Sequence, residues 1–322
     1  MTPVAIGIDI GGTNTVFGLV DREGNCLEER RVSTNEYTGA DAFLRHLFVE
    51  LDLLIESYPN HAVQGIGIGA PNGNFYTGSI EYAPNLSWEG VVPLASRFAE
   101  RYELPAVLTN DANAAAMGEM LFGAAQNMRH FVVITIGTGL GSGIVINGEV
   151  LYGHDGFAGE IGHTIAKSGG RRCSCGRFGC LETYVSGRGM RQTISELLGA
   201  SFDKSSLRSI PLTEITSKDV FEAAQNGDKI AIEAFEFTGR RLGKALADTV
   251  AHLSPEAVFI FGGVAKAGDL LLNPTRKHYE ENVLHIYRNK VKILPSGLNN
   301  RNAAILGAAA LLWQHIDKQQ LA

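Results

Sequence analysis

Residues 8–20 read IDIGGTNTVFGLV, and residues 134–146 read ITIGTGLGSGIVI. Each stretch has an apolar strand, a turn of glycine with Thr, Ser or Asn, and a second apolar strand. They begin about 126 residues apart, which indicates two related half-molecules facing each other. Glycines let the backbone approach an anion closely, and the N–H and hydroxyl groups of such turns can donate to phosphate oxygens. The pair therefore predicts two loops that grip one polyphosphate from opposite sides of a cleft.

Length and composition describe an ordinary globular chain. Its 322 residues allow one large domain or two medium ones, with 45% hydrophobic and 19% charged residues. A net charge of −6 and the lack of a basic run argue against a nucleic-acid partner. No apolar run is long enough to span a bilayer, and the first strand leaves no room for a signal peptide. We therefore expect a cytoplasmic protein with no membrane partner.

Cysteine usage agrees with a reducing compartment. Three of the four cysteines are crowded into one short segment, which points to a metal site before a disulfide. The remaining Cys26 is interpreted as an ordinary strand residue.

Hydrophobic periodicity predicts strands and helices in an α/β order. The expected strands are Val4–Ile10, Thr15–Val20, Cys26–Val32, Val63–Gly69, Ala106–Thr109, Phe131–Ile136, Ala257–Phe261 and Val291–Leu294. The expected helices are Asp41–Ser57, Val91–Tyr102, Ala112–Phe122, 217–226, 228–253 and Asn302–Gln314. The Gly-rich stretch 153–181 is too long for an idle loop and is a candidate functional segment.

Four motifs together resemble the ROK family of bacterial sugar kinases and sugar-responsive repressors. They are DIGGTN at 9–14, IGTGLGSG at 136–143, EIGH at 160–163 and CSCGRFGCLE at 173–182, in the family's order. The resemblance implies an α/β, actin-like ATPase (ribonuclease H-like) fold with two lobes around a central cleft. ROK repressors carry an additional N-terminal helix-turn-helix, whereas this sequence starts in the first strand, so we expect the kinase branch.

The expected lobes are discontinuous in sequence. Residues 1–115 plus 301–322 form the small α/β lobe, with the first phosphate loop and the sugar-binding residues. Residues 116–300 form the large α/β lobe, with the second phosphate loop, the zinc loop and the adenosine site. No low-complexity linker separates them, so hinges are expected near residues 115 and 300.

The resemblance assigns ATP and Mg²⁺ to three glycine-containing turns. In the first, glycines and Thr13 would cradle the β- and γ-phosphates while Asp9 helps to hold Mg²⁺ through water; Asn14 stands where relatives often have a basic residue. The alternative is a tight hairpin whose glycines only supply positive φ, and the third turn taken alone is equally compatible with a simple turn. The nucleotide-binding candidates are Asp9, Gly11, Gly12, Thr13, Asn14, Gly137, Thr138, Gly139, Gly141, Gly262 and Gly263.

Asp111 is the candidate general base. It lies where a short strand ends and a helix begins, so the residues alone favour helix capping over catalysis. The resemblance implies that it takes the proton from the attacking sugar hydroxyl. The resemblance also assigns sugar hydroxyls to Asn85, Asn110, Glu160, His163 and Glu182, whose carboxylates, amides and imidazole suit a ring of vicinal hydroxyls. Asn72 in GAPN stands where relatives commonly have a small residue and could alter the sugar pocket.

Cys173, Cys175 and Cys180 form a C-x-C-x4-C pattern that starts ten residues after His163. Three thiolates and one imidazole make a closed tetrahedral structural zinc site, and the family has this ligand set. The alternative is a group of surface or redox cysteines. If one ring nitrogen of His163 binds zinc, the other is fixed for the sugar, so zinc removal should damage sugar affinity and stability together.

These expectations define an ATP-dependent hexose 6-kinase of carbohydrate metabolism, with glucose as the first substrate and glycolysis as its setting. Kinases for N-acetylglucosamine, N-acetylmannosamine, fructose and allose share the pattern, and polyphosphate replaces ATP in some relatives. A non-catalytic sugar-binding regulator and an actin-like assembly ATPase are the alternatives from other classes. We expect a homodimer that binds a small-molecule hexose and ATP.

Overall fold

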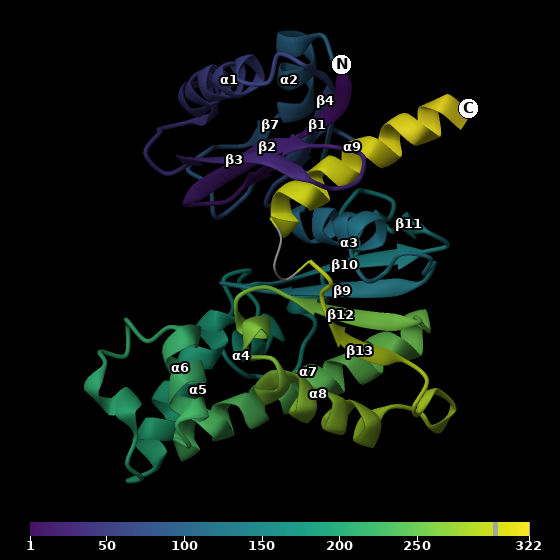
Figure 1. Cartoon of the computed structure of the whole chain (residues 1–322). Coiled ribbons are helices and arrows are strands. Elements are labelled where there is room, and N and C mark those ends of the chain that lie inside the picture. Colours follow the sequence, from purple (N-terminus) through teal and green to yellow (C-terminus); the bar gives the residue numbers. More distant parts are fainter. Residues whose placement is uncertain (299–301, 322) are drawn as a thin grey trace. The chain divides into compact units, whose positions relative to one another are not determined.

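The computed structural model describes residues 1–298 and 302–321, and the chain forms two compact units, each described separately below (Figure 1). The first unit comprises Met1–Met128, Gly143–Ala158 and Asn300–Ala322, and the second comprises Arg129–Ser142 and Gly159–Asn299. The first unit runs past the expected boundary at residue 115 because the whole of α3 (Asp111–Phe122) packs against α9 (Ala303–Leu321). The expected boundary and hinge near residue 300 lie outside the described residues.

The first unit is built on a five-stranded mixed sheet with the order β3-β2-β1-β4-β8. Its strands are β1 (Thr2–Ile10), β2 (Asn14–Val20), β3 (Cys26–Ser33), β4 (His61–Gly69) and β8 (Ala106–Thr109). The first three are antiparallel neighbours, whereas β4 and β8 run parallel to β1. The hairpin quoted above therefore becomes β1, a turn and β2.

Alternation along β1 separates two layers, because successive strand side chains point to opposite faces. Ile6 and Ile8 belong to a core with the apolar faces of α1 (Ala40–Glu56) and α2 (Leu94–Tyr102). Gly7 lies on the other face, where a Cβ atom would come within 2.2 Å of the Ile305 carbonyl oxygen in α9.

Helix α9 lies directly on the sheet because glycine leaves room for its backbone. At Gly67 in β4, a Cβ atom would come within 1.8 Å of the Ala308 carbonyl oxygen. The same packing recurs between helices, where Gly307 of α9 contacts the backbone of Ala114 in α3. A side chain at these glycines would push α9 away from the strands that carry the first phosphate loop.

Shorter strands complete the first unit. β5 (Gly73–Asn74), β6 (Ser79–Glu81) and β7 (Val91–Val92) form a three-stranded sheet, and β11 (Glu149–Val150) pairs with the end of β10 (Leu140–Ile146). Within the described residues, no helix has the length and apolar character needed to cross a membrane.

The second unit repeats the parallel arrangement. β12 (Ala257–Phe261) lies between β9 (Phe131–Ile136) and β13 (Lys292–Pro295) and is parallel to both. The long helix α7 (Lys229–Leu253) and α8 (Asp269–Asn282) run side by side (Figure 1). Gly239 and Gly243 of α7 make this close approach possible, since a Cβ atom at either would meet α8 within 3 Å.

The smaller helices of the second unit lie in the segment between β11 and α7. They are the 3₁₀ turn η1 (Ile161–His163), α4 (Glu182–Val185), α5 (Gly187–Ala200), η2 (Ser206–Ser209) and α6 (Ser217–Gln225). Two further 3₁₀ turns, η3 (Val264–Ala267) and η4 (His285–Tyr287), flank α8. These short elements carry most of the candidate site residues of this unit.

The predicted elements are found with few exceptions. Helix α2 begins at Leu94 and not at Val91, because Pro93 disfavours a helical conformation for the residue before it. The C-terminal helix continues from the expected Gln314 to Leu321. Helix α5 was not predicted, since the glycines of GRGM weaken the helical signal.

Candidate nucleotide, sugar and zinc sites

The candidate residues of the first unit meet at one edge of its sheet. Asp9 of β1 is the register partner of Gly69 in β4, and Gly69 is the partner of Thr109 in β8. All three strands are parallel, so their carboxyl ends and following loops lie together, which is where α/β sheets bind ligands. Asp9 therefore lies close to Asp111, and Gly69 separates them: a Cβ atom there would lie 3.5 Å from Asp9 Oδ1 and 3.8 Å from Asp111 Cα.

The glycines of the first loop allow other backbone atoms to pack closely against them, and they are not required by a positive φ. Neither Gly11 nor Gly12 is among the described residues with positive φ, so a need for positive φ does not account for these glycines. A Cβ atom at Gly12 would come within 2.4 Å of the Asn85 carbonyl oxygen, which places Asn85 beside the loop. The Gly11 N–H donates to the Asn14 carbonyl at 3.0 Å and closes the turn, while Thr13 is exposed to solvent.

Asn110, not Asp111, caps helix α3. The Asn110 Oδ1 atom accepts the Asn113 N–H at 2.6 Å, and Asp111 is the first helical residue. The capping explanation for Asp111 is therefore wrong. Its Oδ1 accepts the Ala112 N–H at 2.8 Å. The cap leaves Asp111 as a fixed carboxylate at the helix N-terminus.

Asp9 and Asp111 form an electrostatically coupled pair. Burial, followed by the charge of Asp111, raises the pKa of Asp9 to about 7. Loss of hydration also raises the pKa of Asp111. Two neighbouring carboxylates with raised pKa values favour a divalent cation, because oxygen ligands and excess negative charge are what Mg²⁺ requires. The donor set thus fits Mg²⁺ beside Asp9.

We expect Asp9→Asn to stabilise the protein about two to three times as much at pH 8 as at pH 5. A carboxyl whose folded pKa lies near 7, against an ordinary value of 3.8, loses stability as the pH rises between those values. The upper bound is about 4 kcal/mol, and partial solvent access lowers the expected gain at pH 8 to about 2 kcal/mol. Urea denaturation of both proteins at the two pH values tests this. A gain of equal size at both would contradict the shifted pKa.

Asn72 has a local structural role. It adopts a left-handed conformation with φ of 51°, and its Nδ2 donates to the carbonyls of Glu81 at 3.0 Å and Tyr82 at 3.3 Å. These two hydrogen bonds connect the loop after β4 to the end of β6.

Asn72→Gly is expected to cost about 1 kcal/mol of stability and to leave sugar affinity within twofold. Glycine tolerates the same φ, and only the two backbone-directed bonds are lost. Thermal denaturation and the sugar KM measure the two effects. A change in KM of tenfold would instead place Asn72 in the sugar pocket.

The second unit has its own loops at the carboxyl ends of parallel strands. Gly137, Thr138 and Gly139 follow β9, and Gly262 and Gly263 follow the neighbouring β12, whereas Gly141 lies inside β10. Gly262 has φ of 106° and packs on Ile136, so its glycine is required by the turn. At Gly137 and Gly263 a Cβ atom would meet no protein atom within 4 Å. Those two positions are open to a ligand.

A cavity of about 680 Å³ joins these two loops. Its remaining walls come from the first turns of α5 and from α6, which the sequence analysis did not assign to the site. The lining residues are Gly137, Thr138, Gly187, Arg188, Arg191, Thr216, Ser217, Lys218, Phe221, Glu222, Gly263, Val264, Lys266 and Ala267. Such a volume suits a nucleotide, and the four basic side chains suit its phosphates. The missed signal was the cluster of Arg and Lys in 188–218.

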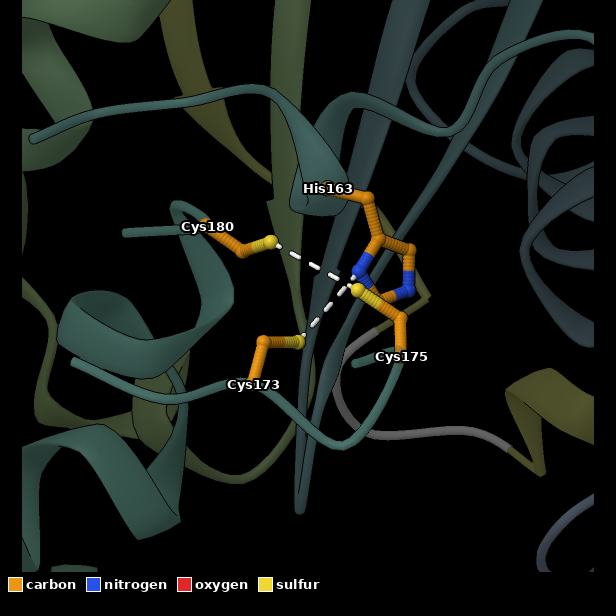
Figure 2. A group of neighbouring side chains, drawn as sticks. All are labelled: His163, Cys173, Cys175 and Cys180. Atoms are coloured by element: carbon orange, nitrogen blue, oxygen red, sulfur yellow. Dashed lines mark hydrogen bonds between the residues drawn. The ribbon is translucent and has the colours of Figure 1, made fainter. Parts of the chain in front are cut away.

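The four predicted metal ligands come together (Figure 2). Their ligand atoms all lie within 4.8 Å of one another, with Cys173 Sγ 3.6 Å from His163 Nδ1 and Cys175 Sγ 3.7 Å from Cys180 Sγ. Zinc bonds of about 2.3 Å to sulfur and 2.0–2.1 Å to nitrogen place tetrahedral ligands about 3.5–3.8 Å apart. The cluster therefore fits structural zinc, with Nδ1 as the histidine ligand atom.

Two further predicted sugar ligands, Glu160 and Glu182, lie beside this cluster, to which the predicted sugar ligand His163 belongs. His163 Nε2, the nitrogen away from the thiols, lies 4.0 Å from Glu160 Oε2. Glu182 Oε1 lies 2.9 Å from Cys173 Sγ, and its Oε2 would lie 3.0 Å from a Cβ atom at Gly139. Glu182 thus stands between the zinc cluster and the second phosphate loop. A zinc ion held by these four ligands would orient His163 and would have no open coordination position.

Ser142 is a positioning residue that the sequence analysis missed. Its hydroxyl donates to the Gly159 carbonyl and accepts the Ile161 N–H at 3.2 Å. Both partners flank Glu160, and Ser142 is buried. The start of β10 therefore holds the EIGH segment in place.

Comparison with known proteins agrees with this architecture. The chain has the actin-like ATPase fold of a solved ROK family glucokinase from Streptomyces griseus, in complex with glucose and AMPPNP. The TM-score is 0.83 at 34% identity, covering 97% of this chain and 99% of that one. The sequence profile of the ROK family matches residues 5–315. The chain belongs to the ROK family.

Curated relatives include enzymes and repressors. A glucokinase of Halalkalibacterium halodurans is 35% identical over 98% of this chain and 96% of its own length. The xylose repressor of Caldicellulosiruptor bescii is 31% identical over 95% of this chain and 77% of its own length. Family membership alone therefore leaves the choice between catalysis and regulation to the site residues.

Proposed function

We propose that this protein is an ATP-dependent hexose 6-kinase that converts glucose to glucose 6-phosphate. The observation that carries the proposal is the Asp111 carboxylate, which is relieved of capping by Asn110 and lies beside Asp9 at the strand ends. A regulator needs neither a fixed base nor a metal-binding carboxylate there. The glucokinase names of the relatives and the glucose bound to the Streptomyces griseus protein support glucose as the sugar.

Asp111 is the proposed general base. Its Oδ1 is held by the Ala112 N–H, so Oδ2 takes the proton of the sugar 6-hydroxyl as that oxygen forms its bond to the γ-phosphorus. The bond from the γ-phosphorus to the ADP oxygen breaks, and ADP leaves with the electron pair. The raised pKa of Asp111 brings the base nearer to neutral pH, where proton transfer from a hydroxyl is most effective.

The remaining residues bind and align the reactants. The cavity with Gly137 and Gly263 holds the nucleotide, and the first loop contacts the β- and γ-phosphates. Mg²⁺ beside Asp9 supplies charge neutralisation for the phosphates. Asn85, Asn110, Glu160, His163 and Glu182 bind sugar hydroxyls, and zinc holds His163 so that Nε2 faces the sugar.

A coupled ADP-release assay tests the proposal. Mg·ATP would be supplied with glucose, N-acetylglucosamine, N-acetylmannosamine, mannose, fructose and allose in separate reactions. Turnover is expected with glucose at the highest kcat/KM. Preference for another hexose would keep the kinase and change the substrate, whereas sugar binding by calorimetry without turnover would establish the regulator.

A further inference from the structure

Arg171 is a buried cation in the second unit that the proposed reaction does not use. Its side chain is 6% exposed, and every N–H of its guanidinium has an acceptor. Nε and Nη2 donate to the two carboxylate oxygens of Glu196 at 3.1 and 2.7 Å. Nη1 donates to the carbonyls of Thr183 at 2.8 Å and Gly189 at 3.0 Å, and Nη2 also donates to Thr193 Oγ1 at 3.0 Å. Five donors are thus directed at fixed acceptors.

The zinc loop fixes the backbone of this arginine. Arg171 lies two residues before Cys173, and its carbonyl accepts the N–H of Gly179, the neighbour of Cys180, at 2.7 Å. Its own N–H donates to the Tyr184 hydroxyl at 2.9 Å. The backbone of Arg171 is therefore held by the segment that carries Cys173 and Cys180.

The side chain holds the start of α5, which forms a wall of the nucleotide cavity. Gly189 and Thr193 lie in the first two turns of that helix, and Gly187, Arg188 and Arg191 on the same turns line the cavity. The Gly187 N–H donates to the Gly137 carbonyl at 2.8 Å, so a shift of α5 moves the second phosphate loop with it.

Aromatic rings complete the enclosure of the guanidinium. Its central carbon lies 4.7 Å from the ring centre of Tyr184 and 5.7 Å from that of Phe237 in α7. A planar cation that stacks and donates in five fixed directions is specific to arginine, because a lysine ammonium is a point charge with three donors.

We propose that Arg171 is a positioning residue that ties the zinc loop to the nucleotide cavity and so sets ATP affinity. The inference rests on the proposed function only in assigning a nucleotide to that cavity. Loss of the side chain removes one donor from each of the carbonyls of Thr183 and Gly189, of which Gly189 keeps the Thr193 hydroxyl, and loosens the first turns of α5.

The experiment measures AMP-PNP binding without sugar by calorimetry, together with zinc content per chain and Tm. For Arg171→Met we expect one zinc per chain and a Kd about tenfold higher, equivalent to about 1.4 kcal/mol. Arg171→Lys should recover less than half of this loss in free energy, because one ammonium cannot reach all acceptors. Glu196→Gln, which weakens the same clamp far from the metal, should raise Kd about threefold.

Arg208 provides a matched control. Its guanidinium also binds α5, but at the far end, through the carbonyls of Leu198 and Ser201. Arg208→Met should leave the AMP-PNP Kd within twofold, because Arg208 is exposed and holds only the end of α5 away from the cavity.

Three results would overturn the inference. One is wild-type affinity in zinc-loaded Arg171→Met, and another is an equal loss of affinity in Arg208→Met. If Arg171→Met loses zinc, wild-type affinity in zinc-loaded Glu196→Gln decides against it. The proposed function fails differently, with no AMP-PNP binding by the wild-type protein.

Discussion

Replacing Asp111 by Asn is expected to lower kcat by about 10²–10⁴-fold while glucose still binds with a Kd within about threefold. Asparagine keeps the shape and can still accept the Ala112 N–H, but it cannot take the hydroxyl proton. Steady-state kinetics and calorimetry with glucose separate the two effects. Turnover within tenfold of the wild type would remove Asp111 from the role of base.

Asp269→Asn is the matched control for this substitution. Asp269 is likewise the first residue of a helix, α8, and its ion pair with Arg276 at 3.7 Å is exposed. The change in charge at a helix N-terminus is therefore the same. A similar loss of activity in this variant would attribute the Asp111 effect to helix electrostatics and not to proton transfer.

Removal of zinc is the second change with a large expected effect. In Cys180→Ala we expect the zinc content to fall from one per chain to near zero and Tm to fall by about 10 °C or more. Structural zinc contributes about 10–16 kcal/mol in small peptides, and a loss of only about 3–5 kcal/mol suffices for this shift. Glucose Kd should rise about tenfold, since His163 and Glu182 lose their support. Metal analysis, denaturation and calorimetry measure the three effects.

Cys26→Ser controls for loss of a thiol. Cys26 lies in β3 of the first unit, outside the cluster, and its Sγ donates only weakly to the Glu28 carbonyl at 3.5 Å. This variant should keep its zinc and its glucose affinity. A zinc-free Cys180→Ala protein with wild-type glucose affinity would separate the metal from the sugar site.

Local sequence signals were sufficient to predict an element or a site where the motif directly follows its strand. The strands before both glycine loops have alternating or continuous apolar residues. The spacing of His163 and the three cysteines predicted a metal site, and the fold brings their ligand atoms within 4.8 Å of one another. Family resemblance supplied roles, such as the base at Asp111, that residue type alone left open to capping. The structure then assigned the cap to Asn110 through its own hydrogen bond.

Sequence reasoning failed where a site residue depends on packing between distant segments. Arg188 and Phe221 line the nucleotide cavity only because α5 and α6 fold back to the loops after β9 and β12. Neither residue lies in a glycine motif, and α5 itself was hidden by its glycines. In the sequence nothing distinguishes Arg171 from other charged loop residues, because its acceptors come together only in the folded chain.

The contact of α9 with Gly7 and Gly67 makes the first unit depend on a helix that is synthesised long after its strands. The roughly 175 residues between the end of the N-terminal segment at Met128 and the start of α9 at Ala303 take roughly 10–35 s to translate at about 5–20 residues per second. Throughout that interval α9 is missing from the face of β1 and β4 that carries Gly7 and Gly67. On the ribosome the sheet of the first unit therefore stays without this contact until α9 has been made.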